Sequence, residues 1–293
     1  MEIAPETRMG AVELTVADLD RTLDYWQREI GLRVLERSDG RASLGTGAGL
    51  GAGAEVLRFV EEPGAKPDNG HTGLYHVALL VPDRASLARW LAHASRDRVQ
   101  LTGLSDHAVS EAIYLRDPDH HGIEIYADRP RELWEGRVSE LLTTFPLDVE
   151  DLLGELDDPA TEPFDGLPDG TIVGHTHLRV SDVPGTIAFY RDVLGIPLTA
   201  ALRDMAAFHG AGGYHHHIGA NIWESAGAQP APPGTATLRH ATILLPDAAE
   251  RDRVVARVAD AGQEPEQRDD GVLVRDPSGN ALLLATPVVT PEP

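Results

Sequence analysis

GAVELTVADLDRTLDYWQREIGL, at residues 10–32, returns without a gap as GHTHLRVSDVPGTIAFYRDVLGI at residues 174–196. The offset between the two stretches is 164 residues (174 − 10 = 164). A second pair has the same offset: LYHVALLVPD at residues 74–83 returns as LRHATILLPD at residues 238–247. Because similar sequence specifies similar local structure, a repeat of this kind indicates two halves built to one design.

Each repeat begins with a short strand and continues into an amphipathic helix. The helix of the first copy is predicted from apolar residues spaced i, i+4, i+7 and i+11, which are Leu19, Leu23, Trp26 and Ile30. Asp18 is a suitable N-cap and Gly31 a suitable stop. In the strand VGHTHLRV, alternation places His175 and His177 on one face. That face must carry polar chemistry or meet solvent.

Within each half the plan of strand, helix and several strands occurs twice, and the second copy closes with a DPD or DPSGN turn before its last strand. The chain therefore contains four modules, at residues 9–62, 73–128, 173–224 and 237–286. Between the halves, the acidic stretch 129–170 is rich in Pro, Gly and Asp, which break regular structure. The predicted organisation is a first pair of modules in 1–128, a linker at 129–170 and a second pair in 171–293.

Composition narrows the possible functions. The 293 residues are 42% hydrophobic and carry a formal net charge of −22, which disfavours nucleic acid and anionic membrane surfaces as partners. The chain has no Cys, so any metal must be held by His and carboxylate side chains. A basic start followed by an apolar segment is missing, as is an apolar run of about 18 residues. These features predict a cytoplasmic protein without a membrane partner.

The four modules resemble the βαβββ units of the vicinal-oxygen-chelate superfamily, which includes glyoxalases, bleomycin resistance proteins and extradiol dioxygenases. The resemblance covers nearly the whole chain apart from the linker and the termini. It implies an α+β fold in which pairs of modules form two cup-shaped sheets. It also implies that metal ligands come from the first and last strands of a module.

Pairing module two with module three completes a three-ligand set. The first strands offer, in module order, Ala11, His76, His175 and His240. Among the last strands, module two keeps Glu124 where module four has Leu283. Pairing module two with module three gives His76, His175 and Glu124. The pairs one with two and three with four are both incomplete. Two imidazoles and one carboxylate leave open positions for substrate and dioxygen, as in non-heme iron(II) oxygenases.

The stretch DHAVSEAIYLRDPDHHGIE, at residues 106–124, resembles the extradiol dioxygenase signature. The resemblance implies that Glu124 is the iron ligand and that His107 and Tyr114 contact the bound catecholate. The sequence departs from the family at His120, where Gly or Pro is usual. In module four the counterparts of Tyr114 and Glu124 are leucines, at 273 and 283, so modules one and four are expected to form a structural barrel filled by Ala11 and these two leucines.

A second segment, GGYHHHIGANIW at residues 212–223, resembles the paired-histidine strand of the same family. His216 aligns with the family's acid–base histidine, and His titrates near the neutral pH that such a role needs. Strand alternation predicts that His215 and His217 face away from His216. The role of His177 is left open by the sequence. Its side chain either contacts substrate or is turned away by strand twist.

The resemblance predicts an iron(II)-dependent extradiol dioxygenase that opens catechol or a substituted catechol, with a small aromatic diol and dioxygen as partners. Manganese, zinc or nickel are other possible metals, and a homo-oligomer is expected. One alternative is a glyoxalase- or epimerase-like metalloenzyme, with a fourth ligand from the run His215–His217. The other is a metal-free protein of the same fold that binds an aromatic drug.

Overall fold

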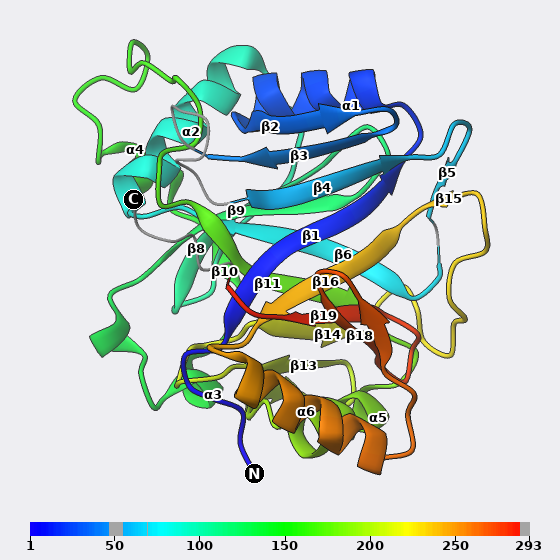
Figure 1. The fold of residues 1–293 in the computed structure, drawn as a ribbon. Helices are drawn as coiled ribbons and strands as arrows, with labels where there is room; N and C mark the ends of the chain where they lie inside the picture. Colours follow the sequence, from blue (N-terminus) through cyan, green and yellow to red (C-terminus); the bar gives the residue numbers. More distant parts are fainter. Residues whose placement is uncertain (47–54, 69, 288–293) are drawn as a thin grey trace, which may run out of the picture.

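A computed structural model describes residues 1–46, 55–68 and 70–287. Residues 47–54 of the first module and 288–293, after the fourth, lie outside the described parts. The chain forms two large, twisted mixed sheets with helices packed against them (Figure 1). The expected α+β fold with cup-shaped sheets is confirmed.

The eight-stranded sheet joins modules one and four. Its strand order is β17-β18-β19-β16-β1-β4-β3-β2, with β1 antiparallel to β16 at the junction. Module one contributes β1 (Arg8–Val16), β2 (Arg33–Ser38), β3 (Arg41–Gly45) and β4 (Glu55–Glu61). Module four contributes β16 (Leu238–Leu244), β17 (Glu266–Arg268), β18 (Gly271–Arg275) and β19 (Ala281–Ala285).

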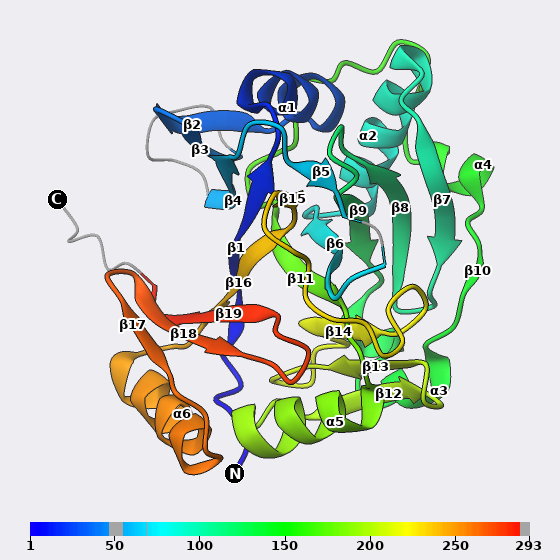
Figure 2. The same ribbon diagram turned by 90° about the vertical axis from the view of Figure 1, so that its right-hand side faces the viewer.

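The nine-stranded sheet joins modules two and three, so the pairing that completes the ligand set is the one that forms. Its strand order is β10-β7-β8-β9-β6-β11-β14-β13-β12, and β6 runs antiparallel to β11 at its centre. Module two contributes β6 (Gly73–Leu80), β7 (Leu101–Asp106), β8 (Ser110–Arg116) and β9 (Gly122–Asp128). Module three contributes β11 (Ile172–Arg179), β12 (Leu198–Leu202), β13 (Ala206–His209) and β14 (Ile218–Asn221). Figure 2 shows this sheet curling from β7 through β6 and β11 to β12.

The helices lie in two groups at opposite ends of the molecule (Figures 1 and 2). One group contains α1 (Leu19–Tyr25) and α2 (Arg84–Asp97), and the other α5 (Val183–Ala188) and α6 (Ala248–Asp260). As predicted, the carboxylate of Asp18 caps α1 by accepting from the Arg21 amide at 3.0 Å, and Gly31 ends the helix in the left-handed region at φ 89°. The sequence did not predict that α1 and α5 continue as wider π-helical turns, η1 (Trp26–Ile30) and η3 (Phe189–Leu194).

Consecutive modules also touch, through their helices and closing turns. The indole of Trp26 in module one donates to Asp117 in module two at 3.3 Å, and the hydroxyl of Tyr190 in module three donates to Asp276 in module four at 3.2 Å. Strand pairing therefore links modules two and three, whereas these contacts link one with two and three with four. A single large cluster of buried apolar side chains spans all four modules.

The connection between the halves packs against the nine-stranded sheet. It contains η2 (Arg131–Leu133), α3 (Val138–Leu141), β10 (Phe145–Pro146) and α4 (Val149–Leu153). β10 pairs with β7 and extends the sheet at its edge. Elsewhere β5 (Lys66–Pro67) and β15 (Thr235–Ala236) form a small separate sheet. Among the helices in the described ranges, none is long and apolar enough to cross a membrane.

Candidate metal centre

Three predicted ligands meet on adjacent strands of the nine-stranded sheet. His76 lies on β6, Glu124 on β9 and His175 on β11. One oxygen of Glu124, Oε2, is 2.9 Å from Nε2 of His76 and 3.1 Å from Nε2 of His175. The two nitrogens are 3.4 Å apart, and all three side chains are buried. Because β9, β6 and β11 are neighbours, residues from two halves of the sequence form one cluster.

The charges in this cluster suit a cation. Burial opposes ionisation of Glu124, but the two imidazoles outweigh it and hold the pKa of Glu124 well below its usual value. Burial lowers the pKa of His175, although Glu124 opposes this shift. The carboxylate is therefore ionised and His175 neutral at pH 7, which are the forms that bind metal. This donor set of two nitrogens and one oxygen fits a divalent transition metal.

His107 and Tyr114 form a hydrogen-bonded pair beside the cluster. Nε2 of His107 is 2.7 Å from the Tyr114 hydroxyl, and Nδ1 is 2.7 Å from the carbonyl of Thr143. A carbonyl only accepts, so Nδ1 carries the proton and Nε2 accepts from Tyr114. Burial, with help from Glu124, raises the pKa of Tyr114 well above its usual value and keeps the phenol protonated. Sequence reasoning missed Thr143, because a backbone carbonyl leaves no residue-type signal.

His216 lies against a predicted ligand. The centroid of its ring is 4.1 Å from that of His175. Burial and the surrounding histidines hold the pKa of His216 well below its usual value, so the ring is neutral. The expectation that His215 faces away from His216 is wrong, since their Nδ1 atoms are 2.8 Å apart. Residues 215–217 precede β14 and follow no strand alternation.

His177 faces the same cavity, which answers the question left open by the sequence. Its ring centroid is 4.9 Å from that of His76 and 5.3 Å from that of Tyr75. Gly219 leaves room for this ring, because a Cβ there would come within 2.7 Å of Nδ1 of His177. A strand bulge follows His177, yet the twist does not turn the side chain away.

All six predicted site residues line one cavity of about 770 Å³. This volume suits a small organic ligand. Its apolar wall includes Leu115, Leu142 and Phe208. Leu142 belongs to the connection between the halves, as do Thr143 and Thr144, which also line the cavity. The segment predicted as a linker therefore supplies part of the cavity wall.

The turn that precedes Glu124 forms despite its departure from the family pattern. His120 adopts the left-handed conformation at φ 68°, which Gly would adopt with less strain. One oxygen of Asp117 accepts from the amides of Asp119 and His121, each at 2.9 Å. These bonds hold the turn in place, so a His is accommodated where the family usually has Gly or Pro.

The equivalent positions in the eight-stranded sheet carry no such cluster in the described ranges. Leu273 and Leu283 pack in an apolar cluster, and Ala11 is also buried, as expected for a structural barrel. Nδ1 of His240 lies 3.9 Å from Glu13, whose carboxylate accepts from Arg239 at 2.8 Å. Burial lowers the pKa of His240, so it lies as a neutral ring beside the Arg239–Glu13 ion pair.

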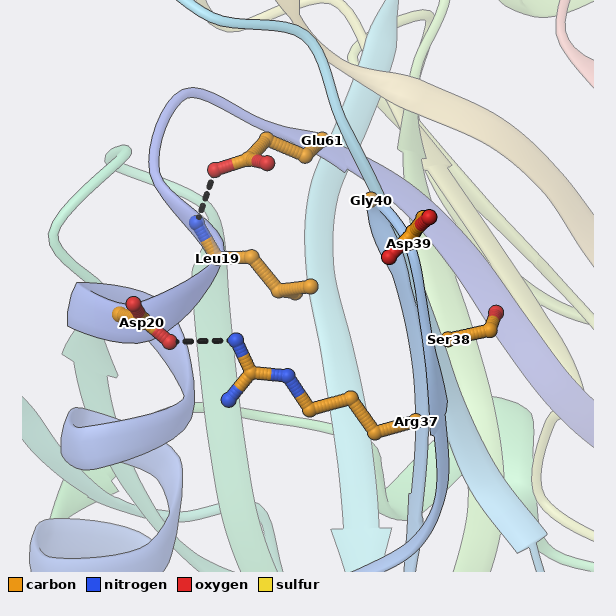
Figure 3. A pocket seen from close by; sticks show the side chains of 7 residues that line it. All are labelled: Leu19, Asp20, Arg37, Ser38, Asp39, Gly40 and Glu61. Atoms are coloured by element: carbon orange, nitrogen blue, oxygen red, sulfur yellow. Dashed lines mark hydrogen bonds and ion pairs between the residues drawn. The ribbon is translucent and has the colours of Figure 1, made fainter.

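A shallower pocket lies between the start of α1 and the turn that joins β2 to β3 (Figure 3). There the Glu61 carboxylate accepts from the amide of Leu19 at 2.9 Å, and Arg37 donates to Asp20 at 2.5 Å. These contacts connect the start of α1 to β4 and to β2. None of the predicted ligands lines this pocket.

Comparison with known proteins agrees with the fold. A family model described as the Glyoxalase/Bleomycin resistance protein/Dioxygenase superfamily matches residues 8–125 and 172–284. The chain is 42% identical over 287 residues to the catechol-2,3-dioxygenase of Bacillus subtilis (strain 168), covering 96% of this chain and 98% of that protein. The fold defines a class of proteins built from βαβββ modules. Within that class, the chain belongs to the glyoxalase/bleomycin resistance/dioxygenase superfamily.

Solved structures share the fold at low sequence identity. The crystal structure of a "putative dioxygenase" from Bacillus subtilis matches with a TM-score of 0.62 and 17% identity, over 95% of this chain and 85% of that one. Glyoxalase I from Zea mays matches with a TM-score of 0.58 and 16% identity, over 96% of this chain and 92% of that one. At such identities the likeness concerns the fold alone.

Proposed function

We propose that the protein is an iron(II)-dependent extradiol dioxygenase that opens catechol or a substituted catechol. The observation that carries this proposal is the buried cluster of Glu124, His76 and His175 inside a cavity that fits an aromatic ring. The 42% identity to a catechol-2,3-dioxygenase over nearly the whole chain supports the same reaction. Manganese or another divalent metal is compatible with these donors.

His76, Glu124 and His175 would hold the metal, which would supply a Lewis acid for the diol and an electron-transfer centre for dioxygen. The protein's own side chains then hold the metal and shape its surroundings. Glu124 supplies negative charge to the cation, while His76 and His175 supply nitrogen ligands. The apolar wall of the cavity excludes water from the ring.

On one wall of the cavity, His107 and Tyr114 contact the bound diol. The phenol of Tyr114 stays protonated; its one proton is donated to Nε2 of His107 in the ligand-free cavity and turns to an oxygen atom of the bound diol, where negative charge develops during the reaction. The Thr143 carbonyl fixes the orientation of His107.

On the other wall, His216 accepts a proton from a substrate hydroxyl and returns it to the ring-opened product. A neutral imidazole is the form that can accept a proton, and burial beside other histidines keeps His216 neutral. Both atoms of dioxygen enter the product. The O–O bond and the ring carbon–carbon bond beside the diol break, and two new carbon–oxygen bonds form.

We also expect the functional form to be a homo-oligomer.

The test is anaerobic reconstitution with iron(II), followed by catechol and air, while the visible spectrum is recorded. A yellow ring-opened semialdehyde that Glu124→Ala fails to produce would support extradiol cleavage at this site. Glutathione-dependent turnover of methylglyoxal with nickel or zinc, without ring opening, would instead support the glyoxalase-like alternative. Tight binding of an aromatic compound without any metal would support the drug-binding alternative.

A further inference from the structure

Asp128, His215 and His216 form a chain of hydrogen bonds that ends at the cavity. Asp128, at the end of β9, has Oδ1 2.8 Å from Nε2 of His215. Nδ1 of His215 is 2.8 Å from Nδ1 of His216, which lines the cavity. His215 itself has no exposed surface and does not line the cavity. A fully buried histidine with both nitrogens engaged is held in one orientation.

The direction of each hydrogen bond follows from the chemistry of the groups. An ionised carboxylate only accepts, so Nε2 of His215 carries the proton. When His215 carries only that proton, its Nδ1 has a lone pair, and the proton between the two rings belongs to Nδ1 of His216. His216 is thereby left with a lone pair on Nε2. That nitrogen is the one able to accept a proton from a ligand.

Packing holds both rings against rotation. Trp134 lies edge-on to His215, with ring centroids 5.4 Å apart. His216 packs between His175, at 4.1 Å, and Phe208, at 5.1 Å. Rotation of either ring would break the bond between the two Nδ1 atoms and disturb these contacts. The bond from Asp128 therefore orients His215, and the bond from His215 in turn orients His216.

We propose that Asp128 and His215 are positioning residues that hold His216 in the Nδ1–H tautomer, with the Nε2 lone pair available to the substrate hydroxyl. This inference rests on the proposed function, since it concerns how the acid–base histidine is prepared. Asp128 need not change its own protonation. The proton passes from the substrate oxygen to Nε2 of His216 and returns to the product.

Two substitutions at His215 separate positioning from packing. His215→Gln offers one acceptor and one donor, so it is able to bond both His216 and Asp128, whereas His215→Leu fills the buried space and makes neither bond. We expect kcat to fall about 10–100-fold in His215→Leu, with little change in the KM for catechol, and to fall much less in His215→Gln. A leucine variant as active as the glutamine variant would overturn the proposal, because packing alone would then suffice.

Nuclear magnetic resonance of ¹⁵N-histidine-labelled protein reads the tautomer without turnover. Two-bond ¹H–¹⁵N correlations, recorded on the zinc-loaded and the metal-free chain, should show His216 as Nδ1–H in the wild type. Asp128→Ala should lose this pattern, and the surface variant Asp151→Asn should keep it. A wild-type His216 found as the Nε2–H tautomer would overturn the proposal. Failure to open catechol with the Nδ1–H pattern intact would overturn the proposed function and leave the assigned tautomer standing.

Discussion

The hydroxyl of Tyr114 lies 2.7 Å from Nε2 of His107, and both side chains line the cavity that holds the metal-ligand cluster. Tyr114→Phe removes the hydroxyl and keeps the ring. Because the phenol turns its one proton from His107 to the oxygen atoms of the diol that gain charge, we expect kcat for ring opening to fall about 100-fold. Iron content should stay unchanged, since Tyr114 is not a ligand. Equal rates for the variant and the wild type would remove Tyr114 from the mechanism.

Metal affinity should depend on the carboxylate of Glu124. Glu124→Gln keeps the shape but removes the charge, so we expect the affinity for iron(II) to fall by more than the 10–100-fold typical of residues that only support ligands. The measurement is metal titration under anaerobic conditions. Glu111→Gln is the matched control, because Glu111 is also buried in this sheet but bonds Arg84 and Arg129 instead. Similar losses in both variants would indicate general destabilisation.

The Asp117–His121 pair should make stability depend on pH. Burial opposes protonation of His121, but Asp117, 2.9 Å away, outweighs it and raises the pKa of His121 above its usual 6.5. A raised pKa stabilises the fold below the unfolded-state value and loses this effect as pH rises through the folded value. His121→Asn places the side chain found at the equivalent Asn280, which bonds Asp276.

We therefore expect the advantage of the wild type over His121→Asn in free energy of unfolding to shrink between pH 6 and pH 9. Urea unfolding at several pH values measures it. A difference that is independent of pH would mean that the pKa of His121 is the same in the folded and the unfolded protein.

Gly122 should be intolerant of a side chain. A Cβ there would lie 1.9 Å from the carbonyl oxygen of Tyr75 on the neighbouring strand, so backbone would have to move. We expect Gly122→Ala to lower the free energy of unfolding by about 1–3 kcal/mol or more. Gly103→Ala is the control, because a Cβ at Gly103 would meet Tyr114 at an ordinary 3.6 Å. Thermal unfolding that ranks the two variants equally would contradict this reading.

His177 should lower the stability of the ligand-free protein. Its Nε2 atom is buried and has no hydrogen-bond partner among the described residues, and burial with the nearby histidines holds its pKa well below the usual value. An unpaired buried polar atom costs about 1–3 kcal/mol. His177→Phe removes that atom and keeps a flat ring, so the thermal midpoint of the metal-free protein should rise. A lower midpoint would show that this nitrogen is satisfied in solution.

The sequence predicted the modules and the candidate ligands, because both depend on residue types at regular positions. The 164-residue repeat and the spacing of apolar residues specified the strand–helix units. Counting histidines and carboxylates over the four modules also favoured the pairing of modules two and three over one with two and three with four. That inference worked because ligands at matching strand positions must lie on adjacent strands to meet.

Only the tertiary structure decided how those side chains are held. The Thr143 carbonyl that fixes His107, and Asp128 that bonds His215, lie outside any repeating pattern. The wrong expectation for His215 had the same origin, since alternation fails where the chain is not a strand. Contacts made by irregular segments depend on the path of the whole chain. The spacing of residues within one segment does not indicate that path.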